Sequence, residues 1–312
     1  SIGAFDRHLT TSVDVLTAQS SSGSIFVTEA NGVTVDDVTV TVTEFESDAT
    51  LGGETDAAQS DLTTGADGDI LLVSTLGDIV LNDGTATGAG QVVWANGSGS
   101  IRIDAADGSI DANGDLLSDT GLITLRAAVN IELGVDVDVA TANHISLNAF
   151  GGTLTLDGSA NVTATDSSAR LAADGDITVG NVAADDVSML SGSGALINAA
   201  GSTMNVTATN LRLEAAGSMG VAGRHLTTDV DVLTALSDTG SIFLTEADGV
   251  TADDVAVTVT GFGADATTDT VTDLVRSDLT TGADGDIVLV STLGDIVLND
   301  GTATGAGQVV WA

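Results

Sequence analysis

Short apolar phrases recur along the chain. Each starts with alternating apolar and polar residues, as in Ser100-Ile101-Arg102-Ile103, and passes through a glycine-containing turn to another apolar residue, here Ile110. Alternation with a period of two is typical of strands that bury one face, and Gly, Asn and Asp favour the turns between them. No sustained 3.6-residue apolar period is visible, so we predict an all-β fold without helices.

The spacing of these phrases predicts a solenoid. Most consecutive anchor residues lie 19–24 residues apart, which is the size of one coil of a three-sided parallel β-helix. The intervals of 45 and 31 residues are interpreted as coils with inserted loops or, for the longest, as two coils. Eight units make up 217 residues, with anchors at Val27, Leu72, Ile103, Leu125, Leu147, Leu171, Leu190, Leu213 and Leu244.

Two other folds compete with this interpretation. An array of antiparallel β-sandwiches would also give short strands and glycine-rich turns, but such modules run to about 100 residues and usually carry a core aromatic residue. An acidic disordered chain is the second alternative, and the regular β-branched runs argue against it. We therefore prefer the solenoid.

A long internal duplication organises the chain. Residues 1–95 align without a gap with residues 218–312 at an offset of 217, and between Ser60 and Ala95 only Leu71 differs, becoming Val288. We interpret residues 1–312 as one continuous solenoid segment, with 1–217 as one module and 218–312 as the start of the next copy. We expect the natural polypeptide to continue in both directions. Solenoid ends without a polar cap predict end-to-end self-association.

Composition narrows the function classes. The chain has 45 acidic residues against seven basic ones, all arginine, for a net charge of −38. Nucleic acids and anionic membranes need cations to neutralise phosphates, so we expect neither as a partner. No apolar stretch approaches the roughly 18 residues of a membrane span, and we expect no membrane insertion.

Candidate catalytic chemistry is scarce. Without Lys or Cys the chain has no phosphate-binding lysine loop, Schiff-base lysine or thiol nucleophile. His8, His144 and His225 have no second histidine at metal-ligand spacing. We predict that the protein is not an enzyme. A polysaccharide-active β-helix enzyme is the remaining catalytic alternative, because carboxylates are plentiful.

Calcium is the cofactor that the acidic turns favour. Carboxylates that alternate with glycine can present several hard oxygens to one ion. We predict weak candidate sites at Asp61, Asp67 and Asp69, repeated as Asp278, Asp284 and Asp286. The alternative is that these residues form turns and a solvated face, or reflect a salty habitat in which charge maintains solubility.

The turn-and-strand phrase also resembles a known family. Asp67-Gly68-Asp69-Ile70 and Asp174-Gly175-Asp176-Ile177 are similar to repeats of filamentous-haemagglutinin-like adhesins and giant repetitive bacterial surface proteins. The resemblance implies a right-handed parallel β-helix, an extracellular or cell-surface location, and a role in attachment or coating. The expected partners are further copies of the protein and the surface or glycans of a host or neighbouring cell. The alternative function is a calcium-dependent adhesin that binds through inserted loops, chiefly residues 44–66 and 261–283.

Overall fold

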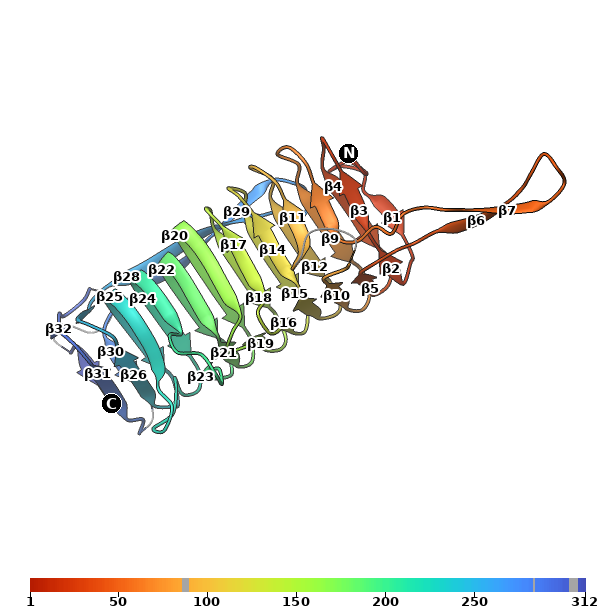
Figure 1. Cartoon of the computed structure of the whole chain (residues 1–312). Helices are drawn as coiled ribbons and strands as arrows, with labels where there is room; N and C mark the ends of the chain where they lie inside the picture. Colours follow the sequence, from red (N-terminus) through yellow and green to blue (C-terminus); the bar gives the residue numbers. More distant parts are fainter. Residues whose placement is uncertain (86–89, 283, 303–307) are drawn as a thin grey trace.

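The computed structural model describes residues 1–85, 90–282, 284–302 and 308–312. Its elements are all β-strands, and most of them stack in parallel along one elongated body (Figure 1). Two antiparallel hairpins interrupt the coils. The predicted all-β class and parallel stacking are confirmed. The described residues include no helix with the length and hydrophobicity of a transmembrane span.

Backbone pairing arranges the strands in ladders, in which each coil pairs with the coils before and after it. The first ladder consists of β1 (Leu9–Thr11), β4 (Ile25–Glu29), β9 (Ile70–Ser74), β12 (Ile101–Ala105), β15 (Ile123–Ala127), β18 (Ile145–Ala149) and the second halves of β20 (Asn161–Ala173), β22 (Asn181–Ser191), β24 (Val206–Ala215) and β25 (Leu226–Ser237).

Two more ladders complete the coils. The second contains β3 (Ala18–Ser20), β8 (Leu62–Thr64), β11 (Gln91–Ala95), β14 (Asp115–Ser118), β17 (Asp138–Thr141) and the first halves of β20, β22 and β24. The third contains β2 (Val15–Leu16), β5 (Val33–Val35), β10 (Ile79–Asn82), β13 (Ile110–Asn113), β16 (Ile131–Leu133), β19 (Leu154–Leu156), β21 (Ile177–Val179) and β23 (Leu196–Asn198).

Identical residue types stack from coil to coil inside the body. Ile70, Ile101, Ile123 and Ile145 pair in sequence along the first ladder and are all 0% exposed. Full burial of such a side chain stabilises the fold by about 1.5–3 kcal/mol. At the preceding turn a Cβ on Gly99 would lie 2.1 Å from the Gly68 carbonyl oxygen, so the close approach of coils requires glycine there.

The predicted anchors hold through the first five intervals and fail in two later places. The register runs from Val27 through Leu72, Ile103, Leu125 and Leu147 to Leu171. Leu171 then pairs with Met189, not Leu190, because alternation points Met189 inward and the pattern offers two adjacent apolar residues.

The second failure concerns the junction between the copies. Leu213 pairs with Ala235, whereas the predicted anchor Leu244 pairs with Leu226. Residues 232–237 therefore stack on the first ladder, although their counterparts 15–20 belong to the third and second ladders. The prediction of eight coils per module is wrong, because the second copy starts at a different position around the stack.

The 45-residue interval from Val27 to Leu72 is a single coil with an inserted hairpin, so the two-coil alternative is wrong. In the first copy β6 (Thr41–Phe45) pairs antiparallel with β7 (Leu51–Thr55), and this hairpin projects away from the body (Figure 1). In the second copy β28 (Val255–Phe262) pairs with β29 (Thr268–Arg276), and this hairpin runs back along the body (Figure 1).

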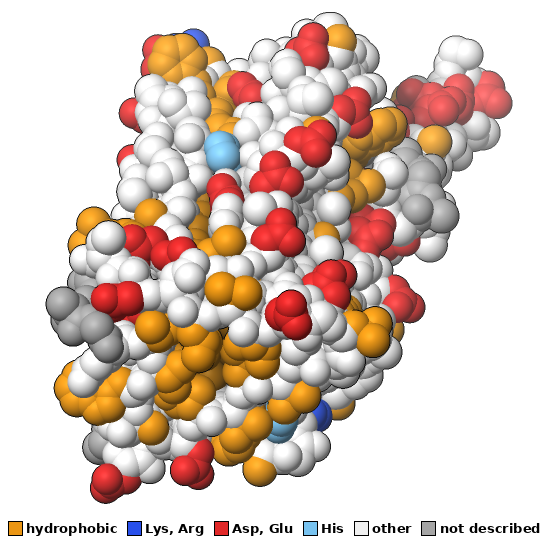
Figure 2. All heavy atoms as spheres, turned by 90° about the vertical axis from the view of Figure 1, so that its left-hand side faces the viewer, with side chains coloured by type: hydrophobic (Ala, Val, Ile, Leu, Met, Phe, Trp, Pro, Cys, Tyr) orange, Lys and Arg blue, Asp and Glu red, His pale blue; other side chains and the backbone are white. Residues whose placement is uncertain are grey.

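The last coils are built from β26 (Ile242–Glu246), β27 (Val250–Ala252), β30 (Leu279–Thr281), β31 (Ile287–Ser291), β32 (Ile296–Leu298) and β33 (Val310–Trp311). Figure 2, which views the left-hand side of Figure 1, shows hydrophobic side chains gathered on this end of the body. Ile296 and Leu298 are 40% and 50% exposed, although their counterparts Ile79 and Leu81 in the body are 0% exposed, and Trp311 is 60% exposed. The apolar interior of the stack is thus uncovered at this end.

Candidate functional site

The predicted calcium residues of the first copy tie turns and coils together. Asp61 is buried and accepts hydrogen bonds from the Ser60 hydroxyl (2.7 Å) and, through its other oxygen, from the Gly84 amide (3.3 Å). Asp67 accepts the Ser98 amide at 2.9 Å. Asp61 and Asp67 have φ of 68° and 53°, in the left-handed region that Asp tolerates better than most residues.

Asp69 also bonds to the neighbouring coil. Its carboxylate accepts the Ser100 amide at 2.8 Å, and burial raises its pKa above the ordinary value. In the second copy Asp278 is buried with φ of 70°, Asp284 has φ of 54°, and Asp286 is exposed. These contacts favour the turn interpretation, and the calcium sites stay a prediction.

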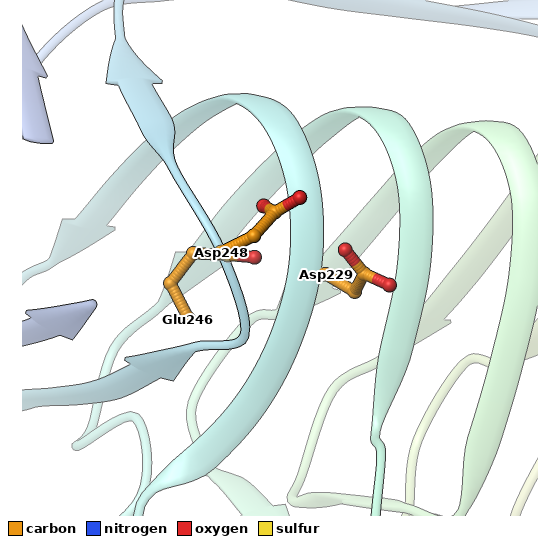
Figure 3. Close-up of side chains that lie close together, drawn as sticks. All are labelled: Asp229, Glu246 and Asp248. Carbon is orange, nitrogen blue, oxygen red and sulfur yellow. The ribbon is translucent and has the colours of Figure 1, made fainter. Parts of the chain in front are cut away.

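A different carboxylate group lies close together in the described part of the chain. Oxygens of Asp229, Glu246 and Asp248 are within 4.8 Å of one another (Figure 3), whereas the predicted triads do not form such a group. Asp229 comes from β25, Glu246 ends β26 and Asp248 lies in the turn that follows.

Glu246 in this group is already bonded to protein donors. It accepts the Thr228 hydroxyl at 2.6 Å and the Val230 amide at 2.9 Å, while burial raises its pKa. The equivalent Glu29 of the first copy is likewise buried and accepts the Val13 amide. Because this pairing recurs in the first copy, where Ser12 and Asn31 replace Asp229 and Asp248, we assign Glu246 a role in joining coils.

The residues that sequence reasoning missed form a row on the outer face of the first ladder. Register places Arg102, Thr124, Ser146, Arg170, Ser188, Arg212 and Thr234 side by side on consecutive coils, and we call this set the arginine row. The signal was present in the sequence. Three of only seven cations occupy the second position of the strand phrase. Whether they lie next to one another depends on the length of each coil between them, which the sequence alone did not fix.

The hairpin of the second copy covers the arginine row. At its tip the Phe262 amide donates to Thr124 Oγ1 at 2.9 Å, and the Arg102 guanidinium donates to the Phe262 carbonyl at 2.8 Å. Midway, Arg170 Nε donates to both carboxylate oxygens of Asp273, at 3.1 and 2.9 Å. A guanidinium that binds both oxygens of a carboxylate forms a strong and geometrically specific contact.

Further polar contacts surround this pair. Ser188 is 0% exposed and donates to Asp273 at 2.6 Å. Near the hairpin base Arg212 donates to the Leu274 carbonyl, and Arg276 donates to Glu214 at 3.0 Å. Burial alone would raise the pKa of Glu214, but Arg276 and Arg212 together lower it below its ordinary value. Hydrogen bonds from arginines therefore run from the tip of the hairpin to its base.

Comparisons with known proteins give no family assignment. No protein-family model matches the chain, and no curated protein or solved structure matches it significantly. The resemblance to filamentous-haemagglutinin-like repeats stays a prediction.

The turn interpretation of Asp67 makes a distinct prediction from the calcium interpretation. We expect Asp67→Asn to change the free energy of unfolding by less than about 0.5 kcal/mol, because asparagine keeps an acceptor for Ser98 and tolerates positive φ. Asp67→Ala loses both properties and should cost about 2 kcal/mol. Thermal unfolding with and without calcium checks this. Stabilisation of the wild-type chain by millimolar calcium that Asp67→Asn abolishes would establish the calcium site instead.

The buried ion pair should hold the hairpin on the body. Asp273→Ala removes the carboxylate that Arg170 and Ser188 share, and we expect it to weaken docking by about 3 kcal/mol. Hydrogen exchange of β28 and β29 amides should then accelerate towards that of β6 and β7. The matched control is Asp56→Ala at the equivalent position of the projecting hairpin, which should alter neither exchange nor thermal stability at concentrations where the chain is monomeric. Unchanged exchange in Asp273→Ala would show that the pair does not fasten the hairpin.

Proposed function

We propose that this chain is part of a bacterial extracellular or cell-surface scaffold, built as a right-handed, three-sided parallel β-helix and without catalytic activity. The observation that supports this most strongly is the continuous parallel pairing that links β1 near one end with β33 at the other within one 21-stranded sheet. A stack of this kind transmits load through coil-to-coil hydrogen bonds, and each added coil lengthens the rod without needing a larger core.

Exposed apolar residues on the first and last described coils support self-association as a proposal. Ile296 and Leu298 are 40% and 50% exposed on the last coils, and Leu9 is 47% exposed on the first, whereas its counterpart Leu226 is 2% exposed. Strand edges with free backbone groups and apolar neighbours favour pairing with another chain. The net charge of −38 opposes random aggregation, which leaves the apolar ends as the preferred contacts.

A second candidate function is adhesion through the inserted loops. Residues 44–66 include the tip and the second strand of the hairpin that projects from the body, and Phe45 and Leu51 there are 74% and 75% exposed. Apolar side chains carried on a polar, projecting element suit a partner surface. The corresponding loop, residues 261–283, lies on the body; its last residue is outside the described residues.

Scaffolding predicts that the purified chain behaves as a rod that joins end to end. We expect sedimentation velocity to show concentration-dependent oligomers with a high frictional ratio, and electron microscopy to show particles that lengthen at constant width. Trp311→Asp should suppress the lengthening, because it places a charge on the apolar end. Compact monomers at the highest soluble concentration would contradict self-assembly.

A further inference from the structure

The two inserted hairpins share their docking residues but differ completely in environment. Val257, Val259 and Phe262 are 1%, 1% and 4% exposed against the body. Their counterparts Val40, Val42 and Phe45, identical in type, are 49%, 57% and 74% exposed. The apolar residues that seat the second hairpin are therefore present, without a surface to cover, on the first.

The polar anchor is also repeated. Asp273, which binds Arg170 and Ser188, corresponds to Asp56, and both follow the threonine that pairs across the hairpin base. Thr41 and Thr55 bond through their hydroxyls at 2.9 Å, as do Thr258 and Thr272. The projecting hairpin thus has the same internal construction and carries the same carboxylate at the same place.

The surface that the second hairpin covers is cationic in an otherwise acidic protein. Arg102, Arg126 and Arg170 line one pocket between this hairpin and the body, together with Gly261 and Val271 of the hairpin. Among the described side chains, the Arg102 Nε atom is buried without an acceptor. Arg102 and Arg126 share one carboxylate of the body, that of Asp104, so the three arginines of the pocket outnumber the body carboxylates that pair with them.

The first hairpin carries those additional carboxylates. Residues 44–59 contain five acidic and no basic residues, for a net charge of −5, against three acidic and one basic, or −2, in residues 261–276. Glu44 and Glu54 stand where the second hairpin has Gly261 and Val271, two of the five hairpin residues that line the arginine pocket, whereas Gly52 replaces the pocket residue Asp269.

One substitution makes the fit tighter. A Cβ at Gly261 would lie 3.3 Å from Thr124 Oγ1, so a glutamate there needs a shift of a few tenths of an ångström. The exchange of Arg276 for Gln59 removes the hairpin's contact with Glu214. The first hairpin thus has two more carboxylates than the second, five against three, and lacks the half-buried Arg276–Glu214 pair.

We propose that the projecting hairpin, residues 38–59, is a docking arm that binds the arginine row of a second molecule of this chain, in place of that molecule's own hairpin. Three observations support this occupant. The hairpin of residues 255–276 already binds the row within the chain, the first hairpin repeats its anchor residues, and the charges of the first hairpin and the row are complementary. The inference deepens the proposed scaffold by adding a lateral contact to it. It differs from end-to-end stacking in depending on the hairpin and on ionic strength.

The test exposes the arginine row in the full chain. In one variant, which we call strap-shortened, two glycines replace Val259–Val271 of the hairpin that covers the row. It also carries Asp273→Ala, so its own hairpin no longer covers the row. We expect sedimentation velocity to show self-association at least tenfold tighter than that of the wild-type chain. Asp56→Ala in this background, or 1 M NaCl, should weaken the association at least tenfold. Far-UV circular dichroism checks that the coils remain folded.

The matched control also replaces Val42–Glu54 with two glycines. Association that persists in this doubly shortened chain arises from the ends, which would support the scaffold and overturn the docking arm. A strap-shortened chain that sediments like the doubly shortened one likewise overturns it. If particles fail to lengthen end to end but the strap-shortened chain still associates through its hairpin, the result would contradict the scaffold and support the docking arm.

A second measurement keeps every coil intact. Replacing residues 261–276 with the sequence of residues 44–59 places the projecting hairpin's residues over the arginine row of the same chain. We expect hydrogen exchange in this hairpin to be as slow as in wild-type β28 and β29. Exchange as fast as in β6 and β7 would show that the sequence does not fit the row, and would overturn the proposal.

Discussion

Parallel pairing between successive coils is the constraint on which the rest of this molecule depends. Each strand of a ladder must present the same inward and outward positions as the strand below it, because a slip by one residue would turn every apolar side chain outward. Ile70, Ile101, Ile123 and Ile145 therefore coincide on the inside. The same rule aligns Arg102, Arg170 and Arg212 on the outside, along one row.

A surface row created by stacking gives a repeat protein a long interface of regularly spaced polar side chains. Here that interface concentrates cations of a protein with only seven, and an acidic hairpin from the following copy covers it. The inserted hairpin thus connects coils that are distant in the sequence, since Asp273 binds Arg170, which lies 103 residues earlier. The hairpin fastens one copy to the preceding one beyond the contacts of adjacent coils.

The alternation of residues predicted much of this fold. It predicted the strands near Ile101, Ile110 and Asp115 and five of the coil registers, because an apolar residue at every second position determines which face of a strand points inward. Where two apolar residues adjoin, as at Met189 and Leu190, or where alanine is the inward residue, as at Ala235, the pattern does not determine the register. The arginine row and the docked hairpin depend on those registers and on contacts distant in sequence, so the sequence alone could not locate them.

The orientation of strands relative to the long axis tests the stacked-coil account most directly. X-ray diffraction from oriented specimens of the purified chain should show a strong meridional reflection at about 4.8 Å, since the strands cross the rod axis and neighbours are separated by one hydrogen-bonding distance. A 4.8 Å reflection perpendicular to the axis, or its absence from well-oriented specimens, would contradict the account.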